Sequence, residues 1–235
     1  MSNPDMDVHV VAATLLLVLS LPQHAEAQVK RDEAVRIAEE YRNLRWTASE
    51  ANAFHGKDAD GTWVDTPDAG FSRPGTRPGW WRAGAENIGM PYQWGGFSSP
   101  KEFRAGLKKG LYAGDVYSAE KRRLGDAAVS RHTVGIDCSG LVSRCWKLKR
   151  PHSTQELPAL CVPLPSFEAL QPGDIVNSPN NHVLLFKAFT DDTKRRILAY
   201  EAGSPPTWKV LLNSVPLSLL EKDGYQPLRY RKVRD

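Results

Sequence analysis

One long apolar run stands near the amino terminus, and the hydrophobic positions after it follow shorter periods. Residues 8–21 (VHVVAATLLLVLSL) precede an Ala25-Glu26-Ala27 motif. The run is short for a bilayer span, and a small-residue A-x-A motif behind such a run is typical of a secretory signal. We therefore expect residues 1–27 to form a signal peptide. Asp5 and Asp7 replace the usual basic start, which leaves a buried amino-terminal helix as the alternative.

Helical periodicity marks three later segments. Residues 31–44 carry early acids and then apolar side chains at spacings of three and four, which predicts an amphipathic helix. A shorter helix is expected near 100–107. Residues 138–148 (CSGLVSRCWKL) predict a helix with one buried face that begins at Cys138.

The carboxyl-terminal third changes to short β-type runs. These runs cover residues 174–177, 182–188, 195–201, 208–212 and 228–233. Helices followed by strands are typical of an α+β domain with an antiparallel sheet. Residues 53–90, rich in Gly, Pro, Asp and Trp, show neither period and predict long ordered loops.

The length of 235 residues suggests one domain with an appendage. We expect residues 28–88 to form a helical and loop-rich extension and residues 89–235 to form the main domain. An apolar fraction of 41% and a charged fraction of 25% exclude a largely disordered chain and a protein with several membrane spans.

The net charge of the chain indicates which classes of partner to expect. Cleavage after Ala27 removes three acids and no Lys or Arg, so the net charge rises from +4 to +7 over 208 residues. Such a surface favours polyanions, which outside the membrane are cell-wall polymers and lipid headgroups rather than nucleic acid. Scattered charge on a solvated surface is the simpler alternative.

Three cysteines are too few for a disulfide scaffold. Cys138 starts a predicted helix, where the helix dipole and unpaired N–H groups favour the thiolate. Its Gly and Ser neighbours allow a tight turn that presents the sulfur and a backbone oxyanion donor to a cleft. Cys145 fits a buried core position, and a disulfide between Cys145 and Cys161 is left open.

A base for this thiol is expected at His182, which begins a strand after a polar turn. If the next hairpin turns at Asp191-Asp192, paired residue numbers sum to 383 and His182 faces Glu201. Glu201 could then orient the imidazole. A one-residue slip would instead bring Tyr200 or Ala202 level with His182.

Four sequence blocks resemble the NlpC-type cell-wall cysteine peptidases, a compact branch of the papain-like fold. The blocks are PYQWGG (91–96), DCSGLV (137–142), LQPGDIV (170–176) and His182-Val183, in the family's order. The resemblance covers roughly residues 89–210. It implies a papain-like α+β fold in which a catalytic helix packs on an antiparallel sheet.

The resemblance also implies roles for three catalytic residues. Cys138 matches the nucleophile, His182 the general base and acid, and Glu201 the polar group that orients the imidazole. The family usually has His, Asn or Gln at this third position, although a carboxylate can hold an imidazole and stabilise its cation.

Further roles follow from the same resemblance. Tyr92 matches a tyrosine whose hydroxyl lies beside the nucleophile, while Asp137 and Ser139 match positions that receive the free amine of the substrate. His152 and Ser153 match a polar segment that borders the cleft. Tyr92 and Trp94 also fit ordinary core aromatics, which is the preferred interpretation for Trp94, and His152 fits a loop surface.

One segment is longer than the corresponding link in the family. The 39 residues 97–135 replace a short link between two of the blocks, and we expect them to cap the cleft and narrow the substrate range. They include a basic group at 121–123.

The combined expectation is a secreted or periplasmic cysteine peptidase that acts on peptidoglycan stem peptides. The γ-D-glutamyl to diamino-acid bond is the target implied by the family. No cofactor is expected, and the Cys and His residues lack the spacings usual for zinc. The expected partners are peptidoglycan peptides and anionic wall polymers, with no nucleic acid and no stable membrane anchor after cleavage. An amidase or transpeptidase on the same thiol and a non-catalytic wall-binding module are the alternatives.

Overall fold

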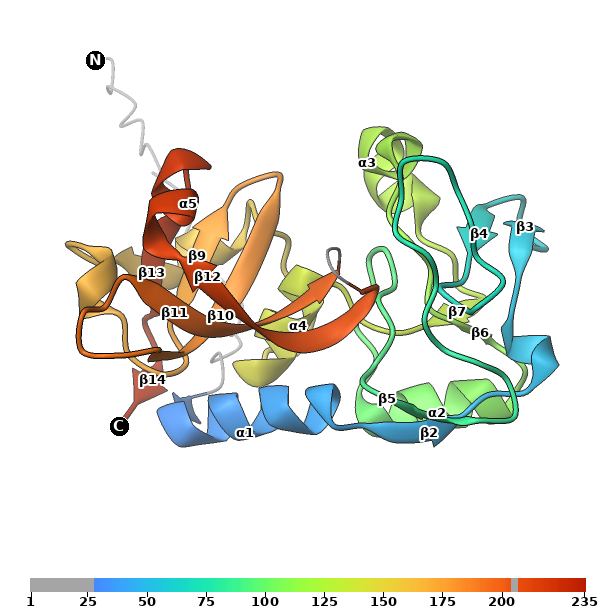
Figure 1. Cartoon of the computed structure of the whole chain (residues 1–235), viewed down its shortest axis with the longest axis horizontal. Helices are drawn as coiled ribbons and strands as arrows, with labels where there is room; N and C mark the ends of the chain where they lie inside the picture. Colours follow the sequence, from blue (N-terminus) through green and yellow to red (C-terminus); the bar gives the residue numbers. More distant parts are fainter. Residues whose placement is uncertain (1–27, 204–206) are drawn as a thin grey trace, which may run out of the picture.

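The sheet that carries the candidate site has six antiparallel strands in the order β12-β11-β10-β9-β13-β8 (Figure 1). The computed structural model describes residues 28–203 and 207–235, so the expected signal peptide lies outside the described residues. The six strands are β8 (Cys161–Pro163), β9 (Ile175–Ser178), β10 (His182–Phe189), β11 (Arg196–Gly203), β12 (Lys209–Pro216) and β13 (Gln226–Tyr230). The prediction of an α+β chain with an antiparallel sheet is confirmed.

All three predicted helices are present. They are α1 (Arg31–Arg42), α2 (Pro100–Lys108) and α4 (Cys138–Cys145), whereas α3 (Ala119–Leu124) and α5 (Leu217–Lys222) were not predicted. Single 3₁₀ turns are η1 (Glu50–Asn52), η2 (Gly125–Ala128), η3 (Leu157–Leu160) and η4 (Phe167–Ala169). Within the described ranges, no helix combines the length and apolarity that a membrane crossing requires.

Short two-stranded ladders organise the loop-rich segments. The pairs are β1 (Val29–Lys30) with β14 (Val233–Arg234), β2 (Arg45–Thr47) with β5 (Glu86–Ile88), β3 (His55–Lys57) with β4 (Trp63–Asp65), and β6 (Tyr112–Ala113) with β7 (Thr133–Val134). The strand expected at 228–233 is divided, because β13 ends at Tyr230 and β14 pairs with β1 instead of continuing the sheet.

Helix α4 lies between two halves of the molecule (Figure 1). The six-stranded sheet, α5 and β14 form one half, the ladders β2–β5, β3–β4 and β6–β7 with α2 and α3 form the other, and α1 runs along the base. Alternate residues of β10 enter two different core clusters: Val183 and Leu185 pack with α1 and α4, and Leu184 and Phe186 pack with α5. This alternation is the period of a strand buried on both faces.

The amino-terminal extension shares its core with the rest of the chain. Tyr41 and Trp46 belong to the same buried cluster as Tyr92, Trp146 and Tyr230. The last two rings stack at 4.7 Å between centroids. Burial of these large aromatic surfaces therefore holds residues 28–88 against the main domain.

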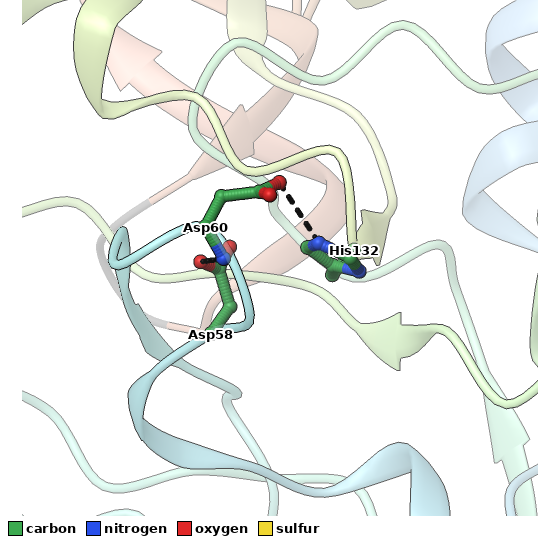
Figure 2. Close-up of side chains that lie close together, drawn as sticks. All are labelled: Asp58, Asp60 and His132. Atoms are coloured by element: carbon green, nitrogen blue, oxygen red, sulfur yellow. Dashed lines mark hydrogen bonds and ion pairs between the residues drawn. The ribbon is translucent and has the colours of Figure 1, made fainter.

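A first polar network ties the β3–β4 turn to the segment before β7 (Figure 2). Asp58 accepts two backbone N–H groups of its own turn at 2.9 Å and the Ser130 hydroxyl at 2.5 Å. Asp60 accepts from His132 Nε2 at 2.9 Å and from the Arg131 guanidinium at 2.5 Å. Asp58, Asp60 and His132 are close enough to hold a metal ion, but protein donors already satisfy both carboxylates, so we assign the cluster a structural role.

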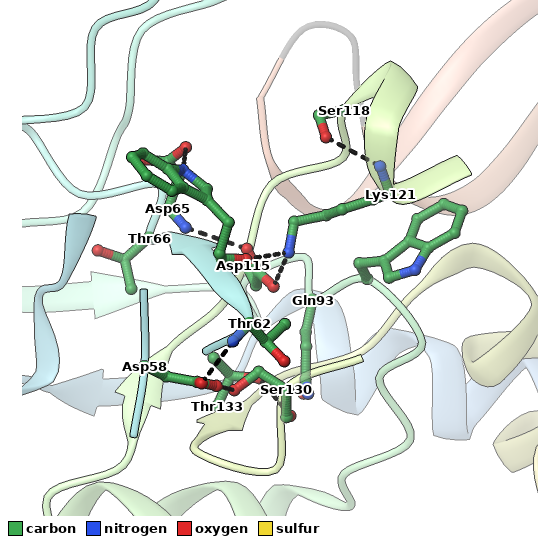
Figure 3. A network of polar contacts seen from close by, with 12 residues as sticks. Asp58, Thr62, Asp65, Thr66, Gln93, Asp115, Ser118, Lys121, Ser130 and Thr133 are labelled. Atoms are coloured by element: carbon green, nitrogen blue, oxygen red, sulfur yellow. Dashed lines mark hydrogen bonds and ion pairs between the residues drawn. The ribbon is translucent and has the colours of Figure 1, made fainter. Parts of the chain in front are cut away.

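A second network is a buried ion pair between Lys121 and Asp115 (Figure 3). Lys121 Nζ donates to Asp115 Oδ2 at 2.5 Å and to the Trp63 carbonyl at 2.6 Å, and both charged side chains are almost fully buried. Burial raises the pKa of Asp115 to about 7, and the Lys121 ammonium opposes this rise. The Asp115 backbone also bonds the residues Tyr92 and Trp94, so this pair supports the segment that carries Tyr92.

Replacing Lys121 by Met should destabilise the fold by about 3–5 kcal/mol, because it leaves a buried carboxylate without its partner. Without the Lys121 ammonium the folded-state pKa of Asp115 rises above its wild-type value of about 7, so the loss relative to the wild type grows as the pH rises above about 7. Urea unfolding at pH 5 and pH 8 measures both effects.

Two variants control this experiment. Adding Asp115→Asn to Lys121→Met should recover part of the stability, since no charge is then stranded. Arg123→Met, on the exposed side of α3, should change the free energy of unfolding by no more than about 0.5 kcal/mol. Equal losses in Lys121→Met and Arg123→Met would contradict the assigned role.

Candidate active site

A groove of about 950 Å³ gathers the predicted site residues. Seven of the eight line it: Tyr92, Asp137, Cys138, Ser139, His152, Ser153 and His182. Glu201, the eighth, is 6% exposed and lies behind the imidazole of His182. The structure thus brings together residues that are more than 100 positions apart in the sequence.

The start of α4 sets the position of Cys138. Asp137 caps the helix, and its Oδ1 accepts the Gly140 N–H at 2.5 Å and the Ser139 hydroxyl at 3.1 Å. The Asp137 N–H in turn donates to the Gly96 carbonyl at 3.1 Å, and a Cβ at position 140 would lie 2.2 Å from that oxygen. The PYQWGG segment, which contains Gly96, thus contacts the DCSGLV segment, which contains Asp137 and Gly140. This contact fixes the position of Cys138.

The three cysteines occupy different environments. All three are free thiols, so the disulfide considered between Cys145 and Cys161 is not formed. Burial raises the pKa of both of these thiols, that of Cys161 to about 12, and keeps them protonated. Cys138 is partly exposed and faces the groove.

A carboxylate lies directly against the imidazole. His182 Nε2 is 2.7 Å from Glu201 Oε2, and the other oxygen of Glu201 accepts Asn213 Nδ2 at 2.9 Å. Asn213, on β12, was not predicted as a site residue, because nothing in its local sequence distinguishes it from any polar strand residue. His182 thus lies between Cys138, which raises the pKa of the ring, and Glu201, which is bonded in turn to Asn213.

The predicted hairpin register is wrong by two residues. Leu185 pairs with Tyr200, so paired numbers sum to 385 near the site instead of 383, and a bulge after Phe186 shifts the register once more. Continuing this pairing sets Gly203 opposite His182, with Glu201 at the diagonal position. A shift of two keeps Glu201 on the same face of the sheet, which is why the hydrogen bond forms.

Gly203 has a second role in this geometry. Its φ of 134° is unfavourable for other residues, and a Cβ there would lie 3.4 Å from the Tyr92 ring and 3.9 Å from His182 Cε1. A glycine at this point allows the tyrosine and the imidazole to approach the strand closely.

Electrostatics favour a charged imidazole. Burial lowers the pKa of His182, but the negative charge and hydrogen bond of Cys138, together with Glu201, raise it to about 10. At neutral pH the ring is therefore an imidazolium between the Cys138 sulfur and the Glu201 carboxylate, and a cation in this place favours the thiolate form that a thiol nucleophile needs.

Tyr92 is the neighbouring proton donor. Burial raises the pKa of its hydroxyl well above the ordinary value, and the charges of Cys138 and Asp137 raise it further. The hydroxyl accordingly stays protonated at any physiological pH. The backbone N–H of Tyr92 donates to the Trp208 carbonyl at 2.9 Å, and the two rings lie 5.7 Å apart, so Trp208 also forms part of the groove wall.

The remaining predicted residues border the groove. His152 is buried, its N–H donates to the Ser143 hydroxyl at 3.0 Å, and its Nδ1 lies 3.1 Å from the Arg150 carbonyl. Ser153 is exposed and is held by Glu156. Burial raises the pKa of Asp137 to about 6, and the N–H groups that it accepts oppose this rise.

Part of the groove wall was not predicted from the sequence. Trp94, assigned to the core, is half-buried and lines the groove, with its Nε1 donating to the Gly125 carbonyl at 3.1 Å. The segment 97–135 contributes Tyr117, Arg122 and Val129 to the same wall. The insertion therefore borders the groove, and the expectation that it caps the cleft and narrows the substrate range stays a prediction.

Replacing Glu201 by Gln should lower the pKa of His182 by about 1 to 3 pH units, because the imidazolium loses a carboxylate at hydrogen-bonding distance. Histidine Cε1 proton titration by NMR, assigned through a His182→Gln variant, measures this change. Glu221→Gln, on the exposed face of α5, is the matched control and should leave the titration unchanged. An unaltered pKa in Glu201→Gln would contradict the assigned electrostatics.

Replacing Asn213 by Leu should slow iodoacetamide alkylation of Cys138 at pH 7 by up to about tenfold. Without this donor, Glu201 is held less firmly against His182, so the imidazolium beside the sulfur that iodoacetamide attacks is less stabilised. The alkylation rate as a function of pH, followed by intact mass, separates this effect from simple loss of access. A profile identical to that of the wild type would rule out a positioning role for Asn213.

Comparisons of the chain with protein-family models, with curated proteins and with solved structures find no match.

Proposed function

We propose that the protein is a cysteine peptidase that cleaves amide bonds through a thioacyl-enzyme. The observation that carries this proposal is the placement of His182 between the groove-facing Cys138 and the buried Glu201. A positioned thiol, base and orienting group constitute the arrangement required for covalent acyl transfer.

The first half of the reaction forms the acyl-enzyme. The Cys138 thiolate attacks the amide carbonyl, a C–S bond forms, and the carbonyl oxygen takes up the negative charge. The Cys138 N–H, which has no acceptor within the helix, and the Tyr92 hydroxyl can stabilise this oxyanion. The imidazolium of His182 then protonates the leaving nitrogen as the C–N bond breaks.

The second half releases the acid. Neutral His182 takes a proton from water, and the hydroxide attacks the thioester carbonyl. The C–S bond breaks, and the sulfur leaves as the thiolate beside a regenerated imidazolium. Glu201 keeps the ring oriented through both proton transfers and stabilises its cation. These steps need no cofactor.

The substrate class and the location rest on the sequence. The four blocks shared with the NlpC-type family support a compact papain-like fold and hydrolysis of peptidoglycan stem peptides, with the γ-D-glutamyl to diamino-acid bond as the favoured target. The apolar run and cleavage motif before residue 28 support a secreted or periplasmic protein. The positive charge of the mature chain fits a wall rich in anionic polymers.

The protein should release peptides from purified sacculi, and Cys138→Ala should lower the initial rate by at least about 10⁴-fold. Mass spectrometry of the soluble products identifies the bond that is cut. Cys161→Ala, which removes a buried thiol away from the groove, should keep the activity within a few-fold of the wild type.

Other outcomes separate the alternatives. Turnover of simple acyl amides with intact muropeptides would indicate an amidase, and new cross-links would indicate a transpeptidase. Equal binding of the wild type and Cys138→Ala to sacculi, with no peptide released by either, would indicate a wall-binding module.

A further inference from the structure

Arg122 is an exposed cation on the wall of the groove. It projects from α3, in the insertion, and its Nη2 donates to the Asn180 carbonyl at 2.8 Å and to Asn181 Oδ1 at 3.2 Å. Its guanidinium carbon lies 5.6 Å from the centre of the Tyr117 ring. The side chain therefore spans from the insertion to the β9–β10 turn in a defined position.

The charge of Arg122 is not neutralised within the described ranges. Arg150, on the same groove, pairs with Glu156 at 2.9 Å, whereas Arg122 has only amide and carbonyl acceptors there. Asp126 lies on the same wall but forms no ion pair with it, and Asp137 is committed to capping α4. An arginine held by neutral acceptors keeps its attraction for an anionic ligand.

The position of Arg122 indicates which part of a substrate it meets. Asn180 and Asn181 directly precede His182, whose ring must come within hydrogen-bonding distance of the leaving nitrogen. The fragment that leaves as the amine therefore lies on the His182 side of the groove, beside the β9–β10 turn. Arg122 is bonded to this turn and lies on the same side.

We infer that Arg122 binds a free carboxylate on the leaving-group fragment of the substrate, an inference that rests on the proposed peptidase function. The turn engages Nη2, whereas Nη1 makes no hydrogen bond to the described residues and can donate to a carboxylate. The Tyr117 ring and the turn hold the side chain before substrate arrives, which reduces the entropic cost of binding. The site thereby selects peptides with a carboxylate over their amidated counterparts.

The test compares two stem peptides that differ only by a carboxylate or a carboxamide on the residue after the cleaved bond. The wild type should favour the acid by about 10- to 100-fold in kcat/KM, and Arg122→Gln should reduce this ratio to about twofold or less. Arg122→Lys should retain part of the preference, because the charge stays while the planar guanidinium held by the turn and the Tyr117 ring is lost. Arg123→Gln, whose residue is exposed and lies 3.9 Å from Glu120, is the matched control and should keep the full ratio.

A binding measurement separates the inference from the proposed function. Calorimetry with Cys138→Ala measures the affinity for both peptides without turnover, and Arg122→Gln in that background should abolish the difference. Equal affinity for the two peptides, or a preference unaffected by Arg122→Gln, overturns the carboxylate site and leaves the peptidase intact. A retained preference with no cleavage by the wild type supports the site and overturns the peptidase. Because both readouts are ratios, a general loss of activity through the nearby turn does not change them.

Discussion

The hydrogen bond between the Glu201 carboxylate and the His182 imidazole is the interaction on which the site depends. Burial alone would favour a neutral ring, and a neutral ring could neither hold a thiolate beside it nor protonate a leaving amine. Cys138 and the Glu201 carboxylate together reverse this preference and raise the pKa of His182, and the low dielectric around the buried Glu201 strengthens its share. The desolvation of Glu201 is offset in turn by Asn213, which satisfies its second oxygen.

Close contacts hold together the segments that build the site, although these segments are distant in sequence. The segment that contains Gly96 meets the start of α4 at a distance that only glycine permits at position 140. The buried Lys121 ammonium joins the insertion to the extension and, through Asp115, to the segment that bears Tyr92. The extension and the insertion are thus structural supports of the groove, since their removal would expose a paired charge or open the packed aromatic core.

The elements that carry the site residues could be predicted from the local sequence, whereas contacts between distant segments could be predicted only in part. The helix that begins at Cys138 and the strand that begins at His182 follow from period and turn residues within ten positions of each. Glu201 was found through a register that was wrong by two, and the result survived because strand faces repeat with the same period. The bulge after Phe186, the donor Asn213 and the wall residue Arg122 depend on contacts between distant segments, which no local pattern records.

For the proposed peptidase, a carboxylate at position 201 has a physical consequence for the whole site. An amide or imidazole at the third position can orient the catalytic ring but adds no full charge, whereas Glu201 stabilises the imidazolium by Coulomb attraction as well. Stronger stabilisation of the cation raises the thiolate population and weakens the ring as an acid toward the leaving nitrogen. Tyr92, kept protonated by its surroundings, supplies an oxyanion donor that does not draw on this balance. The two features are therefore complementary: a carboxylate that stabilises the ground-state ion pair is compatible with rapid turnover when the charge of the transition state is stabilised by an independent donor.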